Sequence, residues 1–119
     1  MSAYSQLVVD DRNGARVIRL ASSRIVDGPS IDALRDELAE AATAAGSSGL
    51  VLDLTGVDLI SSAGIALLRD FARAIESRGA RGSLCCPGPE VEKVLKMVRI
   101  ERLMPMHPDV TAAVAAVAR

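Results

Sequence analysis

A chain of 119 residues suits a single domain with one hydrophobic core. Its formal net charge is −1, and Tyr4 and Phe71 are its only aromatic residues, so neither a basic surface nor base-stacking side chains indicate direct nucleic acid binding. The N-terminal residues do not resemble a secretion signal, and no apolar run approaches about 18 residues, so we expect a cytoplasmic protein without a membrane span.

The first elements in the chain predict a β-hairpin. Short apolar runs at 5–10 and 15–20 flank Asn13-Gly14, a pair that favours a tight turn because both residues tolerate a positive φ. Ile25-Val26 is expected to prolong the same sheet.

The middle of the chain predicts a strand–helix–strand unit that follows a first helix. Ser30 is placed to cap that helix, whose apolar stripe runs to Ala45. The run 49–54 suits a parallel strand buried on both faces, and 83–86 is a second short strand. Between them, an apolar stripe from Ile65 to Ile75 predicts another helix, so the crossover between the strands should be right-handed.

The last part of the chain predicts two further helices. Gly88-Pro89 would open the third helix and Pro108-Asp109 the fourth. The expected fold is therefore a single α/β domain over residues 1–119, with an N-terminal hairpin, a mixed sheet and interleaved helices.

No pattern in the sequence indicates an enzyme, a metal or a cofactor. His107 is the only histidine and is expected to lie in the loop before the last helix. Metal-ligand spacings, phosphate-binding loops and the nucleophile-elbow motif are absent from the sequence. Cys85 and Cys86 are adjacent and cannot form an ordinary unstrained disulfide. We interpret them as the end of a buried strand, with side chains on opposite faces, and keep a redox sensor as the alternative.

Ser61 and Ser62 lie where the second predicted helix begins. One of them can cap the helix, while the next two residues, Ala63 and Gly64, allow close packing. A serine there can also accept a phosphate, because unpaired N–H groups and the helix dipole favour negative charge at a helix N-terminus.

The stretch 53–65, with the sequence DLTGVDLISSAGI, resembles the signature of STAS domains and, more narrowly, of bacterial anti-sigma factor antagonists. The family's common form is D-L-S-G-V-x-x-I-D-S-S-G-L. This resemblance implies a mixed sheet of four or five strands with about four α-helices, mainly on one side. It also implies a protein that binds an anti-sigma factor, often a serine kinase, and thereby frees a sigma factor. In that scheme phosphorylation of the antagonist dissociates the complex, and a serine phosphatase returns the antagonist to its binding form.

The resemblance also assigns roles to residues of this chain. Ser62 stands where the family has its phosphoacceptor, and Ser61 stands in the place of an aspartate. Ser61 therefore remains the alternative acceptor. Ala63 replaces a second serine and Gly64 matches the pattern, and both are expected to let a partner come close.

The partner surface implied by the resemblance extends beyond the two serines. It includes the loop from Asp27 to Ser30, which departs from the family pattern, and the exposed side chains of Arg69 and Arg73. Two alternatives use the same fold without phosphorylation. One is control by oxidation of Cys85 and Cys86, and the other is an accessory subunit of a transporter or a lipid-trafficking complex.

Overall fold

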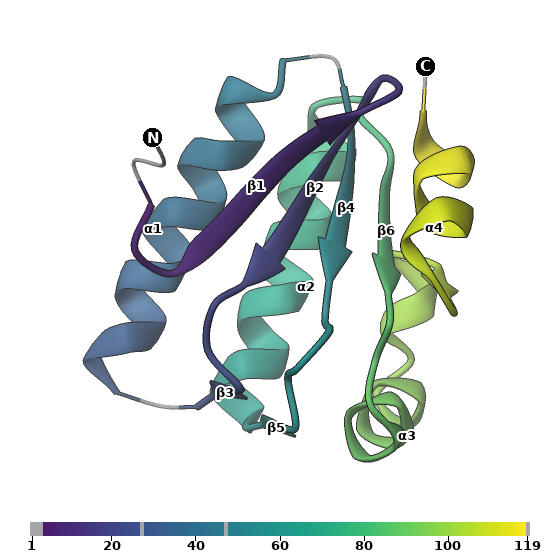
Figure 1. The fold of residues 1–119 in the computed structure, drawn as a ribbon. Coiled ribbons are helices and arrows are strands. Elements are labelled where there is room, and N and C mark those ends of the chain that lie inside the picture. Colours follow the sequence, from purple (N-terminus) through teal and green to yellow (C-terminus); the bar gives the residue numbers. More distant parts are fainter. Residues whose placement is uncertain (1–3, 27, 47, 119) are drawn as a thin grey trace.

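The computed structural model describes residues 4–26, 28–46 and 48–118. Over these residues five strands form a mixed sheet, two short strands form a separate pair, and four α-helices and one 3-10 helix connect them (Figure 1). The elements in chain order are β1 (Leu7–Arg12), β2 (Ala15–Leu20), β3 (Arg24–Ile25), α1 (Pro29–Ala44), β4 (Gly49–Asp53), β5 (Leu59–Ile60), α2 (Ser62–Ser77), β6 (Gly82–Cys85), α3 (Pro89–Met97), η1 (Ile100–Arg102), β7 (Met106–His107) and α4 (Val110–Val117).

The sheet order is β1-β2-β4-β6-β7, with β1 and β2 antiparallel and all later pairs parallel. The predicted hairpin is confirmed, since Asn13 and Gly14 take φ values of 47° and 83° between the two strands. The predicted extension of this sheet by Ile25-Val26 is wrong. Arg24 and Ile25 instead form β3, which pairs with β5 outside the main sheet.

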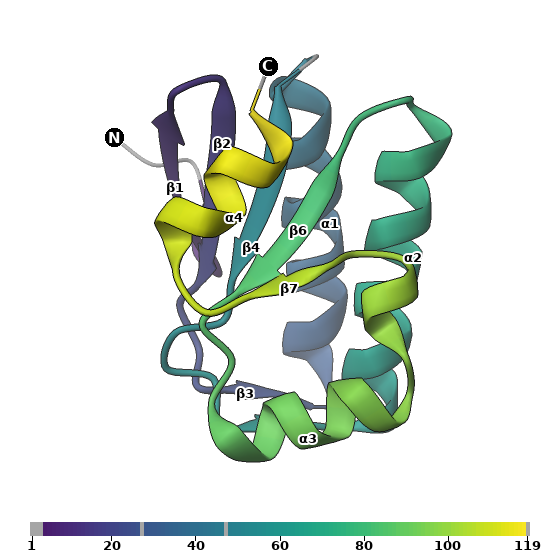
Figure 2. The same ribbon diagram turned by 90° about the vertical axis from the view of Figure 1, so that its right-hand side faces the viewer.

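Helices cover both faces of the sheet (Figures 1 and 2). The larger core contains Ile18, Leu52 and Leu84 from the strands and the apolar stripes of α1 and α2. The smaller core joins alternate residues of the same strands, such as Val51, to the inner face of α4. The expected α/β fold is therefore confirmed, with α1 and α2 on one face, α4 on the other, and α3 at the end of the molecule where β3 and β5 lie.

The helix starts follow the sequence in all but one case. Ser61 and Asp109 cap α2 and α4 through their side chains, and α3 begins at Pro89 as predicted. The predicted cap at Ser30 is wrong, because α1 begins at Pro29 and Gly28, at φ 134° and two residues before Ser30, takes the N-cap position. A proline at the first helical position needs no N–H donor, which explains why the helix starts there.

His107 lies in a strand and not in the predicted loop. Together with Met106 it forms β7, and the sheet register pairs it with Cys85. Its Nε2 atom is buried without a hydrogen-bond partner among the described residues. A strand of two residues is too short to show an alternating pattern in the sequence, so β7 can be recognised only from its pairing with β6 in the structure.

Among the described residues, the helices are too short or too polar to cross a lipid bilayer.

Candidate functional site

The candidate site is the start of α2, at the end of the molecule where β3 and β5 also lie (Figure 1). The chain leaves β4 at Asp53, passes through a short loop, pairs β5 with β3, and then turns into α2. This path delivers Ser61 and Ser62 to the surface on the amino end of a helix of 16 residues.

Of the two serines that the sequence offers as a cap, Ser61 is the N-cap of α2. Its backbone is extended, with φ −92° and ψ 175°, and its Oγ accepts a hydrogen bond of 3.2 Å from the amide of Gly64. Its own amide donates to the carbonyl of Ile25 at 2.9 Å, which ties the helix start to β3. The half-buried Ser61 side chain is therefore part of the local structure.

Ser62 is the first residue of α2, and its side chain is exposed. The first turn of α2 contains no acidic residue, whereas α1 carries Asp32 there and α3 carries Glu90 and Glu92. The positive end of the α2 dipole is thus not offset by a carboxylate in its own first turn. An added negative group at Ser62 would be stabilised by this end of the helix.

The two serines should respond differently to removal of the hydroxyl. Ser61→Ala is expected to lower the free energy of unfolding by about 1 kcal/mol, because it leaves the Gly64 amide without its cap. Ser62→Ala is expected to change it by less than about 0.5 kcal/mol, since the side chain is exposed. Urea unfolding of both variants checks this, and equal losses would contradict the assignment of the cap to Ser61.

Gly64 is buried, and its small size serves the fold of the protein itself. A Cβ atom there would lie 2.6 Å from the carbonyl oxygen of Ile25 and 2.8 Å from Cγ1 of Ile60. The interpretation that Gly64 leaves room for a partner is therefore corrected, because β3 and β5 already fill that room. Ala63 beside it is half-buried.

The two arginines of α2 have different surroundings. Arg69 is half-buried and donates to the carbonyl oxygen of Val98 at 2.9 Å, so it links α2 to the end of α3. The prediction that Arg69 is exposed is therefore wrong. Arg73 is exposed and shares one helix face with Ser62, about 16 Å further along the axis.

Ser30 and Asp27 complete the predicted partner surface. Ser30 is exposed in the first turn of α1, and Asp27 lies outside the described residues. A residue that the sequence analysis missed is Leu59, which exposes 43 % of its surface in β5, two residues before Ser61. The pair Leu59-Ile60 gives no sequence signal of which side chain is exposed, because only pairing with β3 fixes which way each one points.

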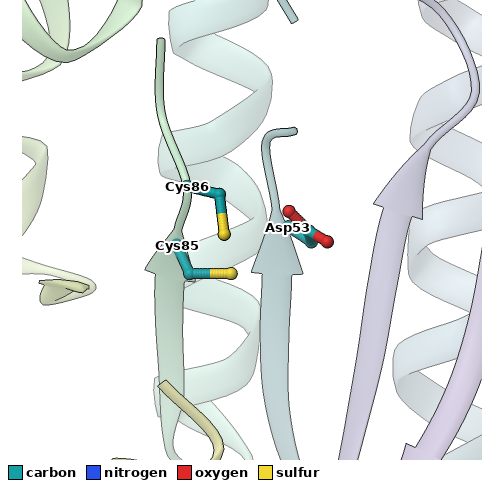
Figure 3. A group of neighbouring side chains, drawn as sticks. All are labelled: Asp53, Cys85 and Cys86. Atoms are coloured by element: carbon teal, nitrogen blue, oxygen red, sulfur yellow. The ribbon is translucent and has the colours of Figure 1, made fainter. Parts of the chain in front are cut away.

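Cys85 and Cys86 do not point to opposite faces as predicted. Cys85 ends β6, but Cys86 has a φ of 59°, and this turns its side chain back toward β4 (Figure 3). The two thiols meet the carboxylate of Asp53, with all three ligand atoms within 4.8 Å of one another. Burial raises the pKa of the Cys85 thiol well above its usual range, and Cys86 and the charge of Asp53 add to the rise.

A comparison of the sequence with models of known protein families identifies the family of this chain. The family model of the STAS domain matches residues 6–113, and the chain therefore belongs to the STAS domain family. It is 30 % identical over 104 residues to a Mycobacterium tuberculosis protein provisionally named an anti-anti-sigma factor, covering 87 % of this chain and 70 % of that one.

Solved structures agree on the fold. An anti-sigma factor antagonist domain from Planctomyces limnophilus superposes with a TM-score of 0.81 at 23 % identity, over 98 % of this chain and all of that one (100 %). The phosphorylated form of the Bacillus cell fate determinant SpoIIAA superposes with a TM-score of 0.65 at 19 % identity, over 89 % of this chain and 95 % of that one.

Proposed function

We propose that this protein is an anti-sigma factor antagonist that acts in the cytoplasm and is switched by phosphorylation of Ser62. In this proposal it binds an anti-sigma factor with serine kinase activity through the start of α2, and so releases a sigma factor. The kinase then phosphorylates Ser62 and the complex separates, and a serine phosphatase restores the binding form. The name and the phosphorylated form of related proteins support this scheme.

The observation that carries the proposal is that the two neighbouring serines have different surroundings. Ser61 holds the helix start through its cap and its bond to β3, while the neighbouring Ser62 hydroxyl is exposed. A kinase can reach an exposed hydroxyl without unfolding the domain. Modification of Ser61 would instead remove a cap that the helix needs.

The same geometry explains how one phosphate could act as a switch. A phosphoserine carries a charge of about −1.5 to −2, and the positive end of α2 accommodates that charge in the free protein. In a complex the same group would have to be desolvated against the partner. An affinity loss of tenfold requires a difference of only about 1.4 kcal/mol between the two situations.

The proposed contact surface follows the exposed face of α2 beyond Ser62. Ala66 and Arg73 lie on that face, and Leu59 adds an exposed apolar side chain beside the helix start. Leu59 would bury apolar surface in the complex, whereas Arg73 would lie near the rim. We therefore expect Leu59 to matter more for affinity than Arg73.

We propose binding and not catalysis at this site. A serine nucleophile needs a general base within hydrogen-bond reach. His107 pairs in register with Cys85, so it belongs to the α4 face of the sheet, opposite the face that α2 covers.

The proposal is tested by incubating the protein with ATP and a serine kinase anti-sigma factor from the same cell, followed by peptide mapping. We expect one phosphate per chain on Ser62, and none in the Ser62→Ala variant. Ser61→Ala serves as the matched control and should still be phosphorylated, at a rate reduced by the frayed helix start. Phosphate found on Ser61 in the unaltered protein would overturn the assignment.

A further inference from the structure

A second group of reactive side chains lies at the carboxyl ends of β4 and β6, on the α4 face of the sheet. We propose that Asp53, Cys85 and Cys86 form a binding site for one thiophilic divalent cation of the zinc class. Their ligand atoms lie within 4.8 Å of one another (Figure 3). Tetrahedral zinc with sulfur and oxygen ligands needs separations of about 3.5–3.8 Å, so a contraction of roughly 1 Å would close the site.

The sheet register creates the first half of this site. Asp53 and Cys85 are paired residues on neighbouring parallel strands, so their side chains leave the sheet on the same face. Both residues are buried, with exposed fractions of 7 % for Asp53 and 0 % for Cys85. A buried carboxylate beside a buried thiol is a costly arrangement for apolar packing, and a cation would compensate it.

Cys86 completes the group through an unusual backbone conformation. Its φ of 59° lies in the left-handed region, which is unfavourable for a residue other than glycine. In an extended strand the side chain of Cys86 would point away from Cys85. The strained residue instead turns its thiol toward Asp53, as Figure 3 shows, and makes two adjacent cysteines converge on one point.

Hydrogen bonds from Thr55 hold the carboxylate of Asp53 in place. The Thr55 amide donates to Oδ1 at 2.9 Å, and the Thr55 hydroxyl donates to the same oxygen at 2.6 Å. Such outer contacts fix the orientation of ligating carboxylates in metal sites. Asp53, though neither cysteine, also lines a surface hollow of about 450 Å³ together with Val17 and Arg19.

Cysteine binds a divalent cation as the thiolate, so metal binding releases protons into solution and strengthens as the pH rises. The fourth position in a three-ligand site of this kind falls to water.

The test is a titration of the reduced protein with Co²⁺ as a spectroscopic probe, followed by displacement with Zn²⁺. We expect one equivalent to produce cobalt–thiolate charge-transfer bands and the d–d bands of a tetrahedral site. Cys86→Ser and Asp53→Asn should each weaken binding by at least roughly tenfold. Circular dichroism and thermal unfolding of the metal-free variants show whether their folds are intact.

Asp58→Asn is the matched control, because Asp58 is an exposed carboxylate in the same loop and lies outside the group of three. It should bind Co²⁺ as the unaltered protein does. The proposal is overturned if the unaltered protein shows no thiolate bands at one equivalent. It is equally overturned if folded Cys86→Ser and Asp53→Asn variants bind with unchanged affinity. The measurement involves no kinase or partner, so it stands or falls separately from the function of Ser62.

Discussion

Ser62→Glu is expected to weaken binding of the anti-sigma factor by at least tenfold while raising the stability of the free domain. The loss of affinity and the gain in stability have the same cause, which is the added negative charge at the start of α2. A carboxylate at the first position of α2 interacts favourably with the helix dipole, which no acid in that turn now offsets, and this is worth about 0.3–1 kcal/mol. In the complex the same charge must be desolvated against the partner, which costs at least about 1.4 kcal/mol for a tenfold loss. Calorimetric titration and urea unfolding measure the two effects.

Ser77→Glu is the matched control for this variant. Ser77 is the last residue of α2, exposed like Ser62, and an acid there faces the negative end of the dipole. It should lower stability by about 0.3–1 kcal/mol and leave partner binding unchanged. If both variants weaken binding equally, the effect is one of net charge and the proposed role of Ser62 is wrong. Normal binding by Ser62→Glu would also exclude the switch, since the added charge would then be tolerated in the complex.

The parts of the fold that the sequence predicts are those with local causes. Asn13-Gly14 fixes its turn through the φ values the two residues tolerate, and Ser61 caps α2 through a contact with an amide three residues ahead. Pro89 starts α3 for an equally local reason, because its missing N–H is not needed there. Each of these predictions is confirmed because no distant residue decides it.

The parts that the sequence did not predict depend on residues far apart in the chain. Arg69 looks exposed on a helical wheel, yet it donates to the carbonyl oxygen of Val98, the C-cap residue of α3. β3 and β5 form only because each supplies the other's partner strand, and neither has a pattern of its own. Asp53 meets the cysteines because β4 and β6 are neighbours in register. Sequence motifs for metal sites are defined by ligands that lie close together in the sequence. They therefore do not detect a group of ligands that comes from two neighbouring strands of a sheet.

Gly64→Ala is expected to destabilise the domain by about 1–3 kcal/mol, after the usual preference of helices for alanine, worth about 1 kcal/mol, is subtracted. The added Cβ would lie 2.6 Å from the carbonyl oxygen of Ile25, a backbone atom that cannot rotate away. The same oxygen accepts a hydrogen bond from the amide of Ser61. Moving α2 outward would therefore break this hydrogen bond, which holds the start of the helix against β3. Overpacking costs about 1–3 kcal/mol and the lost hydrogen bond about 1 kcal/mol.

Gly88→Ala is the comparison that isolates this clash, because Gly88 also lies at a helix start, as the N-cap of α3, but has room for a side chain. Its φ is −67°, and a Cβ there would meet the carbonyl of Val57 at an ordinary 3.5 Å. We expect it to cost less than about 1 kcal/mol in chemical unfolding. If Gly64→Ala were as stable as Gly88→Ala, the contact between α2 and β3 would be looser than the structure has it. A displaced α2 would also move Ser62, so the Gly64→Ala variant should be phosphorylated more slowly even at temperatures where it remains folded.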